Sequence, residues 1–145
     1  MVELLSDREQ QMKVVGLFRE LDSHINQAIQ TIHDMVGKLQ VDNVTAMTTY
    51  LRSGVPVFDV MEASVDPFDR SVQIAGGPSL MSDGVWIWRN DLAYLVERYK
   101  VGLPDEFVSH AMKHKVVSGD KKIIASKWEK IVEAYELAEK GIRSD

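Results

Sequence analysis

The sequence predicts one α+β domain over residues 1–145, in which two long helices near the ends pack with a small antiparallel sheet and two or three short helices. Three observations predict this fold class. Apolar residues recur at helical spacing near both ends, and short alternating stretches occupy the middle. The chain is also 45% hydrophobic and 27% charged. That proportion is typical of a globular domain, and about 150 residues suffice to bury a core.

The N-terminal stretch has the strongest periodicity in the chain. Its apolar residues follow one another at steps of three and four, as in a heptad repeat: Phe18, Leu21, Ile25, Ala28, Ile32, Met35 and Leu39. Ser6 and Glu9 have the spacing of a capping box. We therefore predict one helix over residues 8–39, with Gly16 as its weak interior position.

The C-terminal stretch repeats this pattern in Ile124, Trp128, Ile131, Tyr135, Ala138 and Ile142. Asp120 is suited to cap the helix, which we predict over residues 120–142. Two heptad-patterned helices can pack against each other within one chain or pair with a second copy of it. Intramolecular packing and a homodimer both remain open.

Residues 43–52 come next in order and read as a short helix that Gly54 closes. We predict a small sheet region over residues 55–88. Pro56 cannot donate a ladder hydrogen bond and indicates an edge strand, and residues 71–75 alternate as a further strand. Ser82-Asp83-Gly84 predicts the turn of a hairpin between 80–81 and 85–88.

Two short helices are predicted over residues 90–114. Asn90 or Asp91 is suited to cap the first, which runs to about Lys100. The second begins at Pro104, because proline is favoured at the first position of a helix.

Composition excludes several classes of function. The chain has no cysteine, which excludes disulfides, thiolate nucleophiles and iron–sulfur clusters. No apolar run reaches the roughly 18 residues of a membrane span, and the N-terminal residues do not resemble a signal peptide, so we expect a cytoplasmic protein with no membrane partner. The net charge is −5, and the lysines within 113–130 form only a modest cluster. We therefore expect no nucleic-acid partner.

Catalytic chemistry has little support in the sequence. Glu106, His110 and His114 share one face of the second short helix, and such a face can hold a metal. This keeps a metal-dependent or small-ligand enzyme open as an alternative. Gly76-Gly77-Pro78-Ser79 lacks the Gly-Lys-Ser/Thr of a phosphate loop. We predict no catalytic, cofactor-binding or metal-binding residue, and no cofactor.

The stretch from Ser82 to Phe107 is the most informative for function. It reads Ser-Asp-Gly-x-Trp-x-Trp-x-x-Asp-Leu-x-Tyr, continuing to Tyr99, Leu103-Pro104 and Phe107. Trp86 and Trp88 lie two residues apart and so point to the same side of a strand. Either both belong to the core, or one of them stays partly exposed as an interface anchor beside Arg89 and Tyr94.

This stretch resembles a segment met in small bacterial proteins of toxin–immunity loci. The resemblance implies a protein that binds and neutralises a cognate toxin and carries out no reaction itself. A homodimeric helical regulator or adaptor is the main alternative.

The acidic run between residues 59 and 69 fits an immunity role, because it contains no basic residue among its acids and would attract a basic toxin domain. We predict that the partner-binding residues are Asp59, Glu62, Asp66, Asp69, Asp83, Trp86, Trp88, Arg89, Asp91 and Tyr94.

Overall fold

The protein is an α+β fold built on a mixed four-stranded sheet, in a computed structural model that describes residues 12–142. The strands are β1 (Lys13–Val14), β2 (Val55–Phe58), β5 (Leu80–Ser82) and β6 (Trp86–Arg89). They lie in the order β1-β6-β5-β2, with β1 parallel to β6 and the other neighbours antiparallel. A separate hairpin is formed by β3 (Ser64–Asp66) and β4 (Asp69–Ile74).

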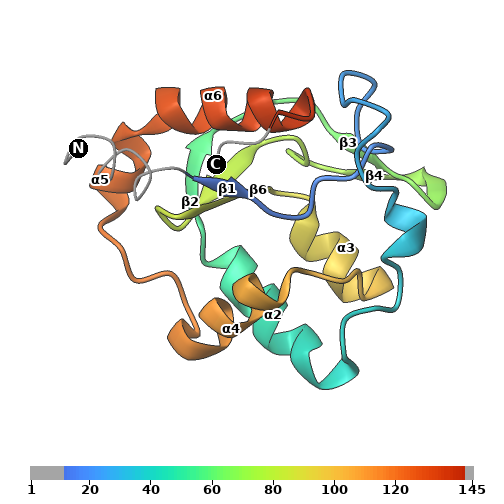
Figure 1. Ribbon diagram of the computed structural model, residues 1–145, viewed down its shortest axis with the longest axis horizontal. Helices are drawn as coiled ribbons and strands as arrows, with labels where there is room; N and C mark the ends of the chain where they lie inside the picture. Colours follow the sequence, from blue (N-terminus) through green and yellow to red (C-terminus); the bar gives the residue numbers. More distant parts are fainter. Residues whose placement is uncertain (1–11, 143–145) are drawn as a thin grey trace.

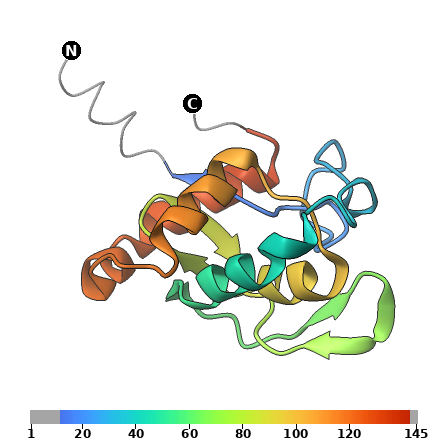
Figure 2. The same ribbon diagram turned by 90° about the horizontal axis from the view of Figure 1, so that it is seen from below.

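Helices lie on both sides of this sheet (Figure 1). The helices α2 (Val44–Arg52), α3 (Leu92–Tyr99) and α4 (Asp105–His114) pack together on one face. The helix α6 (Trp128–Glu139) crosses the other face, and α5 (Lys121–Ser126) lies beside β2. Figure 2 shows the β3–β4 hairpin projecting from one edge of the molecule, next to α3.

Strand β6 divides the core into two clusters. Trp86 and Trp88 point to one side, into the larger cluster beneath α2, α3 and α4. Ile87 points to the other side and packs with Ile131 and Tyr135 of α6. The predicted common side of the two tryptophans is confirmed, and both rings belong to the core, with exposures of 5% and 1%. Neither tryptophan is a surface anchor.

Most short elements in the middle of the chain match their predictions, but the sheet predicted as antiparallel is mixed, because β1 joins it parallel to β6. The helix predicted over 43–52 is α2, and the strand that contains Pro56 is at the edge of the sheet. The predicted hairpin is β5–β6, with Asp83 and Gly84 in its turn. The two helices predicted within 90–114 are α3 and α4. Asp91 precedes α3, but its side chain makes no cap hydrogen bond.

The prediction of one long helix over residues 8–39 is wrong for residues 12–39, the part of this stretch that the structure describes. Residues 12–43 contain β1, a series of turns and two short 3₁₀ helices, Ile32–Asp34 and Val41–Asn43. Residues 8–11 and the capping pair Ser6 and Glu9 lie outside the described residues. Within residues 12–142 the predicted core of two long terminal helices is therefore not formed.

Local hydrogen bonds explain why this stretch is not helical. The side chains of Asp22 and Asn26 each accept from the backbone amide two residues later, at 2.9 and 2.8 Å, and these contacts compete with helical bonding. Gly16 has a φ of +73°, which a right-handed helix does not use. The apolar period arises because the looping chain returns to the core at Phe18, Ile25 and Ile32, each nearly fully buried.

The C-terminal helix predicted over 120–142 is two helices. Asp120 caps α5 as predicted, accepting from the amides of Lys122 and Ile123. The chain leaves helical geometry at Lys127 and then continues as α6, which ends at Glu139. The break allows Ile124 to be buried beside the β5–β6 turn while Ile131 and Tyr135 cover the sheet.

No helix in the described part of the chain is long and apolar enough to cross a membrane.

Candidate functional site

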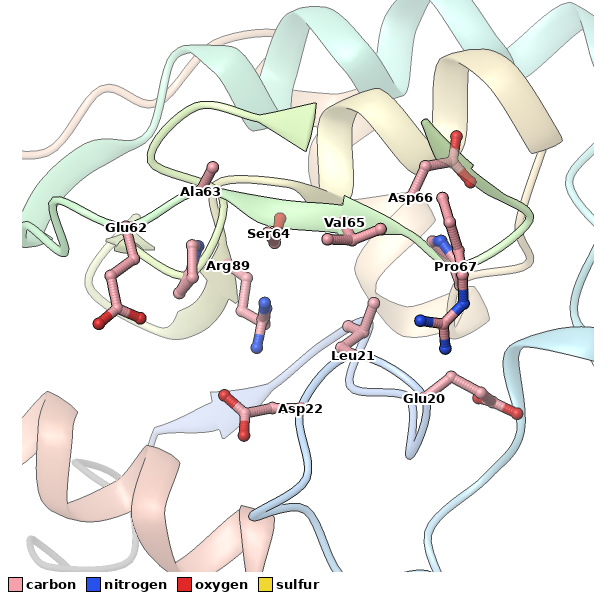
Figure 3. A pocket seen from close by; sticks show the side chains of 12 residues that line it. Glu20, Leu21, Asp22, Glu62, Ala63, Ser64, Val65, Asp66, Pro67 and Arg89 are labelled. Atoms are coloured by element: carbon pink, nitrogen blue, oxygen red, sulfur yellow. The ribbon is translucent and has the colours of Figure 1, made fainter. Parts of the chain in front are cut away.

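A pocket of about 480 Å³ opens between the loop at residues 20–22 and the β3–β4 hairpin (Figure 3). One wall is the loop, a second is the chain from Glu62 to Pro67, and Arg89 of β6 reaches the pocket from the sheet. A volume of this size is within the range of sites that bind small ligands or single side chains. The fold therefore provides a recess where three separate segments of the chain meet.

Carboxylates dominate the lining of this pocket. Glu20, Asp22, Glu62 and Asp66 line it, against the two guanidinium groups of Arg70 and Arg89. Such a surplus of negative charge at the mouth of a recess attracts cations.

Two of these acids are available to a ligand. Glu62 is exposed and makes no hydrogen bond or ion pair with any described residue. Asp22 accepts from the amide of His24 at 2.9 Å, and its side chain is 34% exposed. Glu139 of α6 adds to the negative charge near Asp22: burial, followed by repulsion from Asp22, raises the pKa of Glu139.

The other two acids support the walls. Glu20 accepts from the Thr31 hydroxyl and, at 2.8 Å, from the Ile32 amide. Burial alone would raise the pKa of Glu20, but these hydrogen bonds lower it below its usual value. They fasten the 20–22 loop to the start of the first 3₁₀ helix.

Asp66 holds the hairpin in place. Its side chain is fully buried, and one carboxylate oxygen accepts from the hydroxyls of Tyr94 and Tyr99 at 2.6 and 2.7 Å. The other oxygen accepts from the amides of Phe68 and Asp69. Burial would raise the pKa of Asp66, but the four hydrogen bonds lower it below its usual value. Asp66 is thus a charged anchor between the hairpin and α3.

Arg89 forms the base of the pocket and is only 3% exposed. It pairs with the buried Asp91 at 2.9 Å and donates to the Tyr135 hydroxyl at 3.4 Å. Asp91 also accepts from the hydroxyl of Ser64 at 3.0 Å. Burial alone would lower the pKa of Arg89, but Asp91 and Tyr135 raise it above its usual value. This network joins β3, β6 and α6 behind the pocket.

A second polar cluster lies where α2 and α4 meet the β5–β6 turn. The Tyr50 hydroxyl donates to Asp83 at 2.6 Å, and His110 Nε2 lies 3.1 Å from that hydroxyl and 3.3 Å from Asp83. Asp83 also accepts from the amides of Val85 and Trp86. Burial and the contact with Asp83 raise the pKa of the Tyr50 hydroxyl. The cluster fixes the turn to the helices.

The face of Glu106, His110 and His114, which kept a metal-dependent enzyme open as an alternative, does not form a metal site among the described residues. Glu106 forms an ion pair with Lys13 at 3.0 Å, and His110 belongs to the cluster around Asp83. Residues 12–142 contain no group of three histidine, aspartate or glutamate side chains placed to hold a metal ion.

A second recess of about 400 Å³ is lined by the connection between β2 and β3 through Asp59, Val60 and Met61. Asp59 makes no hydrogen bond or ion pair with any described residue, and Met61 is 97% exposed. Residues 59–63, which we call the connector, therefore run between the two recesses.

The predicted partner-binding residues divide into exposed, half-buried and buried groups. Asp59 and Glu62 are exposed on the connector, and Asp69 is half-buried at the start of β4, where it accepts from Ser71. Asp83 and Tyr94 are half-buried and engaged within the fold. The remaining five are buried: Asp66, Trp86, Trp88, Arg89 and Asp91.

Sequence reasoning missed three parts of the site. Glu20 and Asp22 were hidden within the predicted N-terminal helix, and Tyr50 lay in a helix to which no role was given. The side chains of aspartate and asparagine often accept a hydrogen bond from the backbone amide two residues later. Asp22 and Asn26 therefore could have been interpreted as the starts of Asx turns. No signal in the sequence indicated that Tyr50 would meet Asp83.

No protein-family model matches the chain, and neither curated proteins nor solved structures show a match.

Proposed function

We propose that this chain is a non-enzymatic binding protein of the immunity type, and that it holds a basic protein partner at the connector and the acidic pocket beside it. One observation carries the proposal. The connector presents a fully exposed methionine between two unpaired carboxylates, Asp59 and Glu62, with a recess on each side. An apolar anchor with charges around it is the arrangement that gives tight and specific protein binding.

Three further features support a binding role. The charge of the chain is −5, which favours encounter with a basic partner. Residues 82–107 resemble a segment of proteins from toxin–immunity loci. These residues supply the buried frame of the pocket, since Arg89 forms its base, Asp91 pairs with Arg89, and Tyr94 anchors the hairpin. In this proposal the resembling segment positions the surface rather than forming it.

The first test is capture of the partner. The full chain would be tagged, co-expressed with the products of neighbouring genes in its native host, and recovered for mass spectrometry. We expect one basic protein at near-equal amounts, whose toxicity the chain suppresses. Recovery of the chain alone at dimer mass would contradict the proposal and favour a homodimeric regulator.

Charge reversal locates the surface. The double variant Asp59→Lys/Glu62→Lys should slow association at least about tenfold at low salt, and the effect should shrink at high salt. The matched control is Glu133→Lys/Glu136→Lys, which makes the same charge change at the same spacing on exposed positions of α6. Equal association rates for the two double variants would remove the connector as the binding surface.

A further inference from the structure

The guanidinium of Arg89 has unused donors that face the pocket. A guanidinium carries five N–H groups. In Arg89 the Nε group donates to Asp91, one terminal nitrogen donates to Asp91, and the other donates to Tyr135. Each terminal nitrogen keeps one N–H without an acceptor among the described residues. The side chain is 97% buried, lines the pocket, and points into it in Figure 3. A bound group that accepts hydrogen bonds would satisfy these donors.

The charge of the pocket restricts what this acceptor can be. A phosphate or carboxylate at Arg89 would lie among the carboxylates of Glu20, Asp22 and Glu62 and be repelled by them. Asp91 already neutralises Arg89 at 2.9 Å. An uncharged carbonyl oxygen avoids this repulsion and still accepts from a guanidinium. The geometry therefore favours the carbonyl group of a peptide.

The opposite side of the pocket is suited to a cation. In Figure 3 the guanidinium of Arg89 faces the loop that carries Asp22, yet the two side chains form no ion pair. Glu62 has no partner, and it comes from a different segment of the chain. A planar guanidinium can bridge two such carboxylates with paired hydrogen bonds, whereas an ammonium acts as a point charge.

We infer that this pocket binds one arginine residue of a peptide segment, with its side chain between Asp22 and Glu62 and a backbone carbonyl at Arg89. The inference rests on the proposed function, because it specifies what a basic partner inserts. The same chemistry exists in free guanidinium compounds, which lack the backbone carbonyl. The two sources are therefore separable by the choice of ligand.

The experiment is an NMR titration of the full ¹⁵N-labelled chain with N-acetyl-arginine N′-methylamide. We expect shifts in the amides of residues 20–22 and 62–66. N-acetyl-citrulline N′-methylamide keeps the shape and carbonyls but has no charge, and n-butylguanidine keeps the guanidinium and its single charge but has no backbone carbonyl. Each should bind at least about fivefold more weakly, since one charge-assisted hydrogen bond is worth that much or more.

Two results with the ligand analogues would overturn the inference. If the citrulline compound binds as tightly as the arginine probe, the carboxylates do not select a cation. If n-butylguanidine binds as tightly as the arginine probe, Arg89 does not hold a carbonyl. Glu62→Gln should weaken the arginine probe about fivefold, with Glu133→Gln as the control, because Glu133 is exposed on α6 and does not line the pocket. Equal losses in both variants would also contradict it.

The experiments distinguish failure of the pocket assignment from failure of the proposed function. A captured toxin together with no binding of the arginine probe would refute the pocket assignment alone. Binding of the probe together with no captured partner would refute the immunity proposal alone.

Discussion

Replacing Asp66 with asparagine tests whether the hairpin depends on a buried charge. The carboxylate accepts four hydrogen bonds, from Tyr94, Tyr99 and two backbone amides. Hydrogen bonds to a charged group contribute about 1.5–3 kcal/mol each, against about 0.5–1.5 for neutral ones. Asparagine is neutral. If its oxygen still accepts from the two backbone amides, its NH₂ group lies against the tyrosine hydroxyls and cannot accept the hydrogen bonds that they donate. Part of the loss is offset because a neutral amide is easier to bury than a carboxylate.

We therefore expect Asp66→Asn to lower the free energy of unfolding by about 2 kcal/mol at pH 7. Tyr94→Phe removes only one of the four hydrogen bonds and should lower it by about 1–2 kcal/mol. Urea unfolding followed by tryptophan fluorescence measures both changes. Asp59→Asn is the control, because this exposed carboxylate has no partner and its removal should change stability by less than about 0.5 kcal/mol.

The pH dependence gives the sharper result. The folded pKa of Asp66 is lowered, so its contribution to stability is present above the unfolded pKa of about 3.9 and is lost as the pH falls through the folded value. The difference between the wild type and Asp66→Asn should thus be largest at pH 7 and shrink below about pH 4. A difference below about 0.5 kcal/mol at pH 7, or one that stays constant down to pH 3, would refute this reasoning.

Three other variants test the remaining supports of the pocket. Asp91→Asn leaves Arg89 buried without its counter-charge and should lower the free energy of unfolding by about 3–5 kcal/mol in the same urea assay. Glu139→Gln should raise stability at pH 7, because the raised folded pKa of Glu139 means that its charged form destabilises the fold above that pKa, and the gain should vanish at low pH. Gly77→Ala should lower the midpoint of thermal unfolding by several degrees, because the added Cβ would lie 1.8 Å from the Ser64 hydroxyl oxygen. Calorimetry measures this midpoint, and an unchanged value would contradict the close packing at Gly77.

The elements predicted correctly are those defined by local signals. Pro56 at an edge strand, the Asp83–Gly84 turn and the cap at Asp120 each depend on the chemistry of a few neighbouring residues. The common side of Trp86 and Trp88 follows from the period of two in a strand. Such signals act over a few residues and need no knowledge of the rest of the fold.

The N-terminal stretch failed because its periodicity has a non-helical cause. Ile25 and Ile32 are buried seven residues apart because turns bring the chain back to the core at that interval. An apolar period of seven is therefore compatible with a series of turns when Asp22 and Asn26 provide alternative hydrogen bonds.

The candidate site could be predicted only in part. The exposed acids Asp59 and Glu62 were identified from the run of charge in which they lie. The pocket itself depends on contacts between distant segments, since Arg89 meets Tyr135 across 46 positions of the chain. Whether an acid is buried and satisfied, as Asp66 is, or free, as Glu62 is, depends on such contacts and not on neighbouring residues.

The parallel pairing of β1 with β6 has a consequence for how the molecule assembles. Lys13 lies opposite Trp86, and the amide of Val15 donates to the carbonyl of Ile87 at 2.9 Å, so this pair joins positions separated by half of the chain. Contacts between residues so far apart in the sequence form slowly, because the entropy of closing a long loop is lost before any hydrogen bond between the strands can offset it. During synthesis, Val15 and Phe18 emerge well before β6 exists to cover them. The strand that is made first is thus expected to dock among the last, and its apolar residues are open to other chains in that interval.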